Sequence, residues 1–500
     1  MLFNSFTYLV FLPIVVAIYW AVPARFRTWL LLVASYLFYM NWIPSYGLLI
    51  IFLTLINYGL GLAIAKANER KRLILIIGLC FNLGALCFFK YANFVAENIW
   101  AAICASNQFL HTLMPNMAVS NLDKPVVNIL LPLGISFFTF EFIHYIVDVY
   151  KGSTPIYNLK NFALFAAFFP SQIAGPIKRY QDFMRQLEHP LSLRQADFKG
   201  GIFLILQGLY KKIVLGDNLG LIVNYGFNHA ATLGRLDAWI AVVGFTFQIF
   251  FDFAGYTDIG RGSAMLLGYK VPENFNWPFL ASNLTEFWRR WHMSLSTWLR
   301  DYLFFPLGGS RVSPWAVRRN LMITMILGGL WHGAAWHYVL WGAFHGLGLV
   351  ISKDWHDFVS KFSMLSRWRV TKIWHCSGIA FTLIFLFIAG TLFRADTLNN
   401  VWLMLSTMLP WLTLSDRSHE LVQMFWQSTV PISILAYCLF LSLRLVGPAL
   451  GQSGQLIVID KFAQLWASSA PLRYVTYAFI GLLILGFAPS KMSPFIYFQF

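Results

Sequence analysis

Apolar stretches close to membrane-spanning length recur along the whole chain. A helix needs about 20 consecutive apolar residues to cross a bilayer. Such stretches begin near Tyr8, Trp29, Tyr46, Leu73, Val126, Ile202, Trp239, Leu321, Trp336, Ile373, Val430 and Tyr474. They are continuous and do not alternate between apolar and polar residues, which argues against a closed β-barrel. The sequence therefore predicts an all-α polytopic membrane protein with about 10 to 12 spanning helices, some of the apolar stretches being re-entrant or interfacial.

The composition leads to the same class. Only 12% of the 500 residues are charged and 58% are hydrophobic, whereas soluble domains contain about 25% charged residues. The net charge of +16 does not indicate nucleic-acid binding, because Lys and Arg accumulate in the cytoplasmic loops of polytopic proteins. By this rule Arg25, Arg27 and residues 66–72 lie inside, and the N-terminus lies outside. The five cysteines have neither the spacing of a zinc site nor that of a disulfide framework.

No linker, internal repeat or low-complexity segment divides the chain. We expect one membrane-embedded domain over residues 1–500, with a catalytic core at about 126–350 and with C-terminal helices and an aromatic tail at 370–500. The first apolar segment has no basic start and no small-residue cleavage site, so it is interpreted as a retained helix.

The first polar element of the middle region is residues 168–183, FFPSQIAGPIKRYQDF. Pro170, Gly175 and Pro176 disfavour one uninterrupted helix, and broken backbone at membrane depth must be buried in protein or line a wet cavity. A re-entrant loop or helix corner with Lys178 and Arg179 at its mouth is one interpretation. An ordinary cytoplasmic loop is the other.

The second polar element extends from Phe250 to Gly309. Asp252, Asp258 and Arg261 lie in apolar surroundings, so each needs an internal partner. Further along, aromatic residues recur at roughly helical spacing beside arginines and predict one interfacial helix, whose indoles lie at headgroup depth. The residues concerned are Trp288, Trp291, Trp298, Tyr302, Arg289, Arg290 and Arg300. Interfacial anchoring explains all of that segment except His292.

The third polar element is GGLWHGAAWHYVLWGAFHG, residues 328–346, which places three histidines in an apolar stretch. Ionisable groups at membrane depth are costly and mark functional sites. In one straight helix, His332 and His337 would point about 140° apart and His337 and His345 about 80° apart, which disfavours a three-histidine metal cage. Glycines around His332 allow close approach of a helix or a substrate, so His332 is the candidate functional histidine. His337 and His345 are assigned structural roles.

Four long blocks together resemble one family. SQIAGPIKRYQDF, DFAGYTDIGRGSAMLLGY, NFNWPFLASNLTEFWRRWHMSLSTWLRDYLFFPLGG and GGLWHGAAWHYVLWG resemble the bacterial branch of the membrane-bound O-acyltransferases. Within that branch the sequence is closest to the alginate O-acetylase type, which is related to the D-alanyl transferase of teichoic acid modification. The resemblance covers nearly the whole chain.

The resemblance implies a ring of transmembrane helices around a thinned centre in the bacterial inner membrane, with a cytoplasmic funnel that leads to the active-site histidine. That histidine corresponds to His332, and a second one corresponds to His292. We expect the funnel for donor or substrate to include Lys178, Arg179, Trp288, Arg289, Arg290, Arg300, Asp301 and Trp331. The implied reaction moves an acetyl group from a cytoplasmic thioester, either acetyl-CoA or an acyl carrier protein, to an acceptor hydroxyl. The acetyl group would reach an exported polysaccharide such as alginate with help from a periplasmic acetyltransferase of the SGNH type.

The residue chemistry is compatible with this reaction. Acyl transfer needs a base for the acceptor's proton and a geometry that holds both reactants. A buried imidazole stays neutral because burial disfavours its charged form, so His332 can act as that base. His292 and the Arg or Trp side chains of 288–300 are candidate donors to the developing charge. No bound cofactor or metal, no serine-hydrolase elbow and no phosphate-binding loop is expected.

The chain ends on SPFIYFQF, residues 493–500, in which Phe495, Tyr497 and Phe500 form an FxYxxF pattern. This pattern resembles a terminal motif of the same branch that carries the acyl group on a tyrosine hydroxyl, which makes Tyr497 a candidate acyl relay. The alternative is an aromatic tail anchored at the membrane interface.

Two other classes of function remain at this stage. A transporter would use the buried His, Asp and Arg as a relay, and it predicts inverted repeats with paired broken helices; only residues 168–183 show such a break. A haem or metal protein predicts ligands from facing helices. A member of the same family that acts on another cell-wall polymer is the alternative within the first interpretation.

Overall fold

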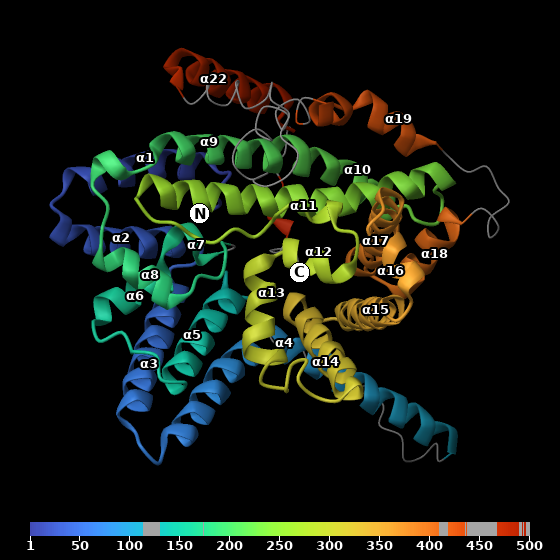
Figure 1. Cartoon of the computed structure of the whole chain (residues 1–500), viewed down its shortest axis with the longest axis horizontal. Coiled ribbons are helices and arrows are strands. Elements are labelled where there is room, and N and C mark those ends of the chain that lie inside the picture. The colour runs from blue at the N-terminus through green and yellow to red at the C-terminus, as the bar shows by residue number, and fades with distance from the viewer. Residues whose placement is uncertain are drawn as a thin grey trace.

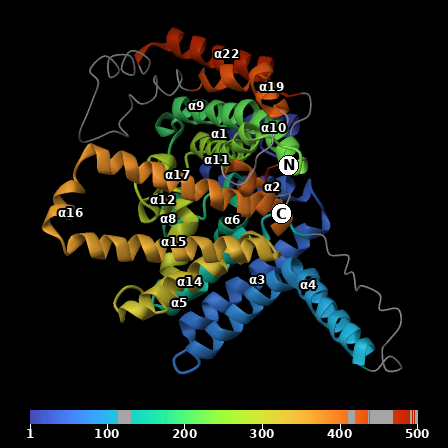
Figure 2. The ribbon, with the colours of Figure 1, turned by 90° about the vertical axis from the view of Figure 1, so that its right-hand side faces the viewer.

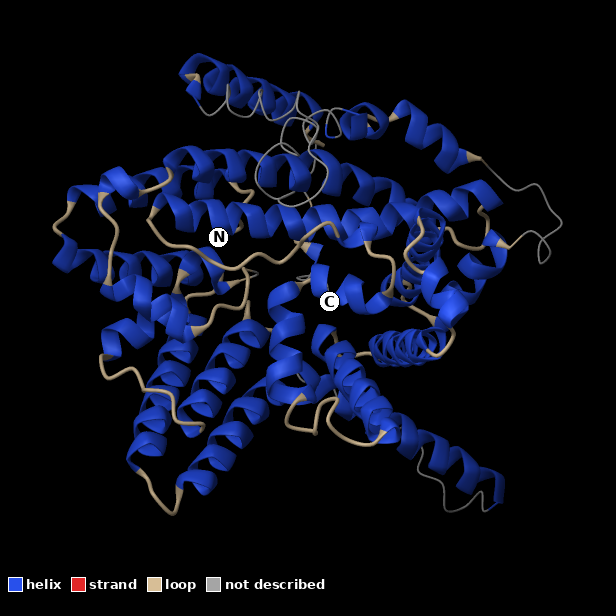
Figure 3. Cartoon of the chain, viewed as in Figure 1, coloured by secondary structure: helices blue, strands red, loops and turns tan. Residues whose placement is uncertain are grey.

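The computed structural model describes residues 1–113, 131–173, 175–409, 419–435, 437, 468–489, 493 and 495–496. This part of the chain consists of helices and loops and contains no β-strand (Figure 3), which confirms the predicted all-α class.

The longer helices are α1 (Phe6–Ala21), α2 (Ala24–Met40), α3 (Ser45–Lys66), α4 (Lys71–Leu113), α5 (Ile135–Tyr150), α9 (Phe198–Leu209), α10 (Asn218–Asn228), α11 (Arg235–Leu266), α14 (Pro314–His332), α15 (Trp336–Ser360), α17 (Lys372–Arg394), α18 (Leu398–Met408) and α22 (Ala470–Phe487). The shorter α-helices are α6 (Leu159–Ala167), α7 (Phe169–Gln172), α8 (Tyr180–Glu188), α12 (Leu284–Arg290), α13 (Met293–Leu299), α16 (Ser363–Trp368) and α19 (Glu420–Gln427). Of the described elements, two are 3₁₀-helices, η2 (Leu193–Gln195) and η4 (Pro278–Leu280), and two are π-helical, η3 (Tyr210–Asp217) and η5 (Arg300–Phe304).

Helices that can span a membrane are found along the whole described chain. Five of the described helices, α3, α4, α11, α17 and α22, are long and apolar enough to cross a bilayer. They agree with a multi-pass protein of the inner membrane. The predicted total of about 10 to 12 spanning helices and the expected division of the chain at about residues 126–350 and 370–500 stay predictions.

Helix α11 lies at the centre of the structure and is the most buried of the five, with 61% of its membrane window inside the protein. Figure 1 shows α9 and α10 alongside it, with α19 and α22 beyond them. Glycines bring α9 and α11 together: a Cβ on Gly208 would lie 2.5 Å from the Gly255 carbonyl oxygen, and one on Gly262 would lie 2.6 Å from that of Gly201. Small residues permit this close packing of backbones in membranes.

The charged residues of α11 have internal partners, as the sequence predicts. Asp258 accepts a hydrogen bond of 2.6 Å from Lys211 of η3. Asp252 pairs with Lys212, which also binds Asp217 at 2.7 Å. Arg261 binds Glu273 at 2.5 Å. A buried charge that keeps a partner avoids most of the cost of leaving water.

The third polar element is not one helix. Helix α14 ends at His332, Gly333 is fully extended with φ −164° and ψ 158°, and α15 begins at Trp336. The predicted angle between His332 and His337 is therefore wrong, whereas the angle between His337 and His345 still applies because both lie in α15. Figure 2 shows α15 and α17 side by side, connected at one end by α16.

The predicted interfacial helix is also interrupted. Helix α12 ends at Arg290, and α13 begins at Met293, because His292 adopts a left-handed conformation with φ 43°. Trp291 and Trp298 are buried, so they are not headgroup anchors. Trp298 instead stacks on Phe140 with the ring centroids 3.7 Å apart.

Residues 168–183 break where the prolines predict. The short helix α7 is followed by irregular backbone, and α8 begins at Tyr180. The described residues from Phe168 to Ile177 are buried, and Lys178 lies in a buried ion pair with Glu141 at 2.8 Å. This is the buried helix corner of the first interpretation, not an exposed loop.

Candidate active site

His332 lies at the C-terminal end of α14, where tight helix packing fixes the backbone. A Cβ on Gly329 would lie 2.2 Å from the Tyr338 carbonyl oxygen, and one on Gly333 would lie 2.0 Å from the Tyr338 ring. The contact between α14 and α15 therefore depends on these glycines. This agrees with the expectation that glycines around His332 allow the close approach of another helix.

Helix α4 binds the end of α14. The Lys90 ammonium donates to the backbone carbonyls of Trp331 and of His332, the latter at 3.1 Å. The Tyr91 hydroxyl donates to the Leu330 carbonyl at 2.5 Å. The last carbonyls of a helix have no partner within the helix, so these two side chains of α4 complete the hydrogen bonding that a continuous helix would have supplied.

His332 is 6% exposed and lines a small cavity of about 60 Å³. Trp341 and Phe393 meet the ring edge-on, with centroid distances of 4.9 and 5.2 Å. We call this space the His332 cavity; it is lined by Phe245, Thr246, Ile249, Phe279, Phe287, Trp288, Trp291, His332, Trp341, His345, Leu386, Ala389, Gly390 and Phe393. Its wall is almost entirely apolar, so a reacting group inside it would be shielded from bulk water.

His345 shares the cavity with His332, although the sequence assigned it a structural role. Its ring is 4.5 Å from the Trp341 ring and 5.2 Å from the Trp288 ring, measured between centroids. His345 Nδ1 and Trp288 Nε1 are buried and have no hydrogen-bond partner within the described residues. Two nitrogens next to His332 are thus available to a ligand. The helix break at Gly333 brings His345 to this place.

His292 lies near His332 but does not line its cavity. The side chain is fully buried, packed edge-on against Phe253 at 4.7 Å and against Trp331 at 5.9 Å between centroids. Neither ring nitrogen has a hydrogen-bond partner in the described structure. Trp331 also contacts the His332 ring at 5.0 Å, so it lies between the two predicted histidines.

A polar cleft forms around the α8, η5 and 270–273 segments. Two adjoining cavities of about 330 and 280 Å³ share Lys178, Arg179 and Asp182. Arg179 binds Asp301 and donates to the Tyr302 hydroxyl at 3.1 Å. Burial alone would raise the pKa of Asp301, but hydrogen bonds from Arg300 and Arg179 outweigh burial and lower that pKa.

Stacked aromatic rings connect this cleft with the neighbourhood of His332. Trp298 lines the cleft and stacks on Phe140. Phe140 in turn stacks on Trp331 with centroids 5.5 Å apart, and Trp331 contacts His332. The cleft and the histidine are therefore parts of one packed unit.

The predicted funnel residues separate into three groups. Trp288 and Trp331 lie next to His332, and Lys178, Arg179 and Asp301 lie in or beside the polar cleft. Three arginines line neither the cleft nor the His332 cavity: Arg289 is exposed, Arg290 binds Glu286 at 2.6 Å, and Arg300 is exposed and binds Asp301.

Sequence reasoning missed Lys90 and Glu141 as parts of the site. Each is the single charged residue of an eight-residue segment, CFFKYANF and FTFEFIHY, and a charge in such apolar surroundings marks a functional position. Their partners could not be read from the sequence, because Lys90 binds a residue 242 positions away.

The C-terminal tail enters the core close to His292. Ile496 donates its backbone N–H to Asp252 at 2.7 Å, and Phe495 stacks on Tyr256 with centroids 4.6 Å apart. Phe495 also contacts Phe253 at 5.6 Å, the residue that packs on His292. Tyr497, the predicted relay, lies outside the described residues.

The described residues do not supply the ligand set that a metal ion requires. The described residues include no group of three or more His, Cys, Asp and Glu side chains that could hold a metal ion.

Similarity to known proteins shows which family the chain belongs to. A sequence profile of the membrane-bound O-acyltransferase family matches residues 71–393. The chain is 36% identical to the probable alginate O-acetylase of Azotobacter vinelandii over the full length of both. It is 34% identical to the peptidoglycan O-acetyltransferase of Helicobacter pylori, over 77% of this chain and 73% of that relative. It is 32% identical to the teichoic acid D-alanyltransferase of Bacillus subtilis, over 53% and 69% respectively.

The matched region contains every residue that lines the His332 cavity. The chain is a multi-pass acyltransferase of the membrane-bound O-acyltransferase family.

Proposed function

We propose that this chain takes an acetyl group from a cytoplasmic thioester and begins its transfer to the hydroxyl groups of an exported polysaccharide of the alginate type. The probable alginate O-acetylase of Azotobacter vinelandii matches it over the full length of both chains, whereas the peptidoglycan O-acetyltransferase matches it over 77% of this chain and 73% of that relative. The observation that carries the proposal is the position of His332, buried at a helix end against a small cavity.

In this mechanism His332 is the general base. A ring nitrogen of His332 accepts the proton of the acceptor hydroxyl, whose oxygen attacks the thioester carbonyl. A carbon–oxygen bond forms, the carbon–sulfur bond breaks, and the departing thiolate takes the proton from His332, which returns to its neutral form. The apolar wall of the His332 cavity excludes water, which would otherwise hydrolyse the thioester.

Negative charge develops on the carbonyl oxygen during the attack. Trp288 Nε1 and His345 Nδ1 are the buried nitrogens without partners beside His332, and we assign them the stabilisation of that charge. His292 then acts as a positioning residue through Trp331, which it contacts.

The donor is a thioester of coenzyme A or of an acyl carrier protein. Both are anionic, and the polar cleft presents Lys178, Arg179 and Lys270. Lys178 is paired with Glu141 and Arg179 with Asp301, so Lys270 is the lining cation that is left to attract either donor. Two cationic segments predicted to lie inside the cell contact the chain close to the ends of α5 and α8, two helices that line this cleft. Arg27 donates to the carbonyl of Leu191, shortly after α8, at 3.4 Å, and Lys71 lies over the ring of Tyr150, the last residue of α5. These contacts support a cytoplasmic entrance at the cleft.

The acetyl group must still cross to the polymer. We propose that a periplasmic acetyltransferase of the SGNH type completes the transfer, with Tyr497 as an acyl relay between the two proteins. An acyl-tyrosine in a C-terminal peptide that disappears in Tyr497→Phe, as detected by mass spectrometry, is the expected result. A tail without modification during turnover would contradict the relay alone.

The test of the function is deletion of this protein from its source bacterium, followed by complementation. Deletion should remove base-labile acetyl esters from the exported polysaccharide, and wild type should restore them. His332→Ala should accumulate in the membrane to the wild-type level without restoring the esters. Loss of esters from peptidoglycan only would assign the acceptor to peptidoglycan, and unchanged esters on every exported polymer would contradict the function.

A further inference from the structure

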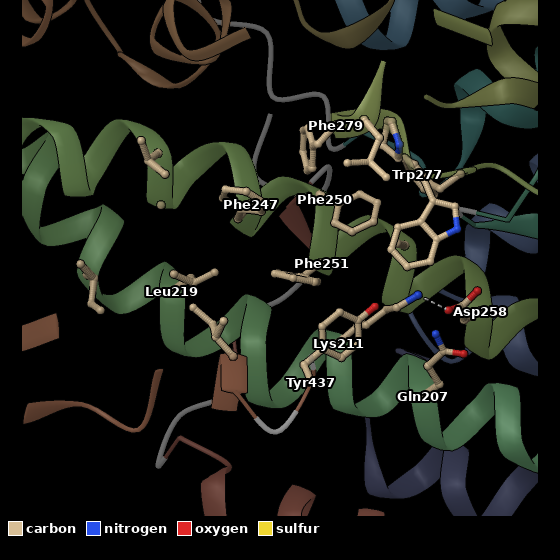
Figure 4. A pocket seen from close by; sticks show the side chains of 18 of the residues that line it. Gln207, Lys211, Leu219, Phe247, Phe250, Phe251, Asp258, Trp277, Phe279 and Tyr437 are labelled. Carbon is tan, nitrogen blue, oxygen red and sulfur yellow. Dashed lines mark hydrogen bonds and ion pairs between the residues drawn. The ribbon is translucent and has the colours of Figure 1, made fainter. Parts of the chain in front are cut away.

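Phe279 separates two cavities of very different size. One side is the His332 cavity of about 60 Å³. The other side is a large apolar chamber of about 860 Å³ between η3, α10, α11 and the loop 273–280. Phe279 is the one described residue that lines both. Figure 4 shows its ring beside those of Phe247 and Phe250, with the Lys211–Asp258 ion pair farther along the chamber.

The His332 cavity has room for a very short acyl chain. About 15 Å³ of such volume holds one water-sized group, so the cavity holds about four. An acetyl group has three non-hydrogen atoms, a butyryl group five and a hexanoyl group seven. The cavity therefore accommodates acetyl and has no space for the two longer groups.

The walls of the His332 cavity on the α17 and α12 sides are tightly packed, so they cannot move easily to make room for a longer acyl chain. On the α17 side, a Cβ on Gly390 would lie 3.2 Å from Thr246 Oγ1, so the backbone of α17 already packs against a side chain of α11 there. On the α12 side, Trp291 stacks on Phe287 with centroids 5.6 Å apart. On the Phe279 side, by contrast, a large empty volume lies directly behind the ring, so a longer chain could gain space there.

Phe279 is itself held firmly. Its ring packs edge-on against Phe247 at 5.0 Å and against Phe250 at 5.2 Å, and it contacts Trp291 at 6.1 Å. Its helical turn η4 follows Trp277, which adopts a left-handed conformation with φ 50°. A bulky residue keeps such a conformation only where its surroundings impose it, so this turn is a fixed part of the wall.

We propose that Phe279 determines acyl-chain length, restricting the enzyme to acetyl by closing the His332 cavity against the apolar chamber. The inference rests on the proposed function, since it requires acyl transfer at His332. The bonds made and broken are those of the acetyl reaction, and only the chain attached to the carbonyl differs. Removing the ring would join the two cavities and give the methylenes of a longer acyl group an apolar space to occupy.

The test compares Phe279→Ala with Phe247→Ala in inverted membrane vesicles, which expose the cytoplasmic face. Phe247→Ala removes a ring of the same kind from the chamber, together with one contact of Phe279. It leaves the Phe279 ring itself between the two cavities, because Phe247 does not line the His332 cavity. Acetyl, butyryl and hexanoyl thioesters of coenzyme A and of acyl carrier protein are supplied separately, each labelled in the acyl group. The readout is label in base-labile esters.

Wild type and Phe247→Ala should transfer acetyl and little of the longer groups. Phe279→Ala should raise the ratio of butyryl to acetyl transfer by about tenfold or more, the usual discrimination of an apolar pocket against added methylenes. An unchanged ratio, an equal rise in Phe247→Ala, or a wild type that already uses butyryl as well as acetyl would overturn the proposal.

Two further results separate this inference from the proposed function. If Phe279→Ala does not accumulate in the membrane, Phe279→Leu takes its place and should show a gain of butyryl transfer; no such gain would contradict the role of Phe279 as the wall. If wild type transfers no acetyl from either thioester, the proposed function fails, whatever the variants do.

Discussion

The Lys90 ammonium donates a hydrogen bond of 3.1 Å to the backbone carbonyl of His332. It also binds the Trp331 carbonyl, so one cation of α4 holds the last turn of α14. A positive charge at a helix C-terminus interacts favourably with the helix dipole. Lys90 therefore positions His332 without touching its ring.

Replacing Lys90 by Met should slow acyl transfer without abolishing it. The end of α14 loses its donor, and a small displacement of a catalytic group costs up to about 100-fold in rate. We expect kcat to fall by about 10- to 100-fold while the KM for the thioester changes little. Lys90→Arg keeps the charge and the donors and should restore most of the rate. Equal rates for Lys90→Met and wild type would remove the positioning role.

His345→Phe should impair catalysis more than binding. The substitution keeps an aromatic ring against Trp341 and Trp288 but removes Nδ1, one of the two nitrogens assigned to the carbonyl oxygen. Loss of one such donor typically lowers kcat by about 100- to 1,000-fold. His337→Phe is the matched control, because His337 does not line the cavity, and it should stay close to wild type. Full activity of His345→Phe would return His345 to a packing role.

The sequence was sufficient for the class of protein, and it singled out His332 as the candidate histidine. An imidazole in an apolar stretch is unusual whatever the fold, and the partners required by Asp252, Asp258 and Arg261 are present. The break after His332 was missed because Gly333 is followed by two alanines, which are strong helix formers. The contact with Tyr338 overrides that local preference.

Which residues form the site depends on tertiary contacts that cannot be read from a single sequence. The pairing of Glu141 with Lys178 joins α5 to the corner at 173–179. The left-handed His292 is held by the neighbouring loop: Met293 donates to the Asn274 carbonyl at 2.9 Å, and Ser294 Oγ donates to the Asn274 side chain at 2.7 Å. Tertiary contacts of this kind decide where a helix of aromatic and basic residues ends.

Gly333→Ala should disturb the site through Tyr338. The added Cβ would lie 2.0 Å from the Tyr338 ring, and that ring packs on Phe393 of the His332 cavity. Overpacking of this kind costs about 1 to 3 kcal/mol, so both the melting temperature and the transfer rate should fall. Gly328→Ala is the control, since its Cβ would lie 3.3 Å from a flexible leucine methyl group. Identical melting temperatures for the two variants would show that the Tyr338 contact does not restrict Gly333.

Asp301 should make the stability of the protein sensitive to acid. Hydrogen bonds from Arg300 and Arg179 lower its pKa in the folded state despite partial burial. A lowered folded pKa means that the ionised carboxylate stabilises the fold at every pH above its unfolded value of about 3.9. This contribution is lost as the pH falls through the folded pKa.

Asp301→Asn should therefore lower the melting temperature of the detergent-purified protein at pH 7, and it should reduce the further drop between pH 7 and pH 3. Asp182→Asn serves as the control. It breaks an ion pair with Arg185 whose side chains are 60% and 73% exposed, and exposed pairs contribute little to stability. An acid-induced drop as large in Asp301→Asn as in wild type would show that the Asp301 pairs do not hold η5 against the 178–180 segment.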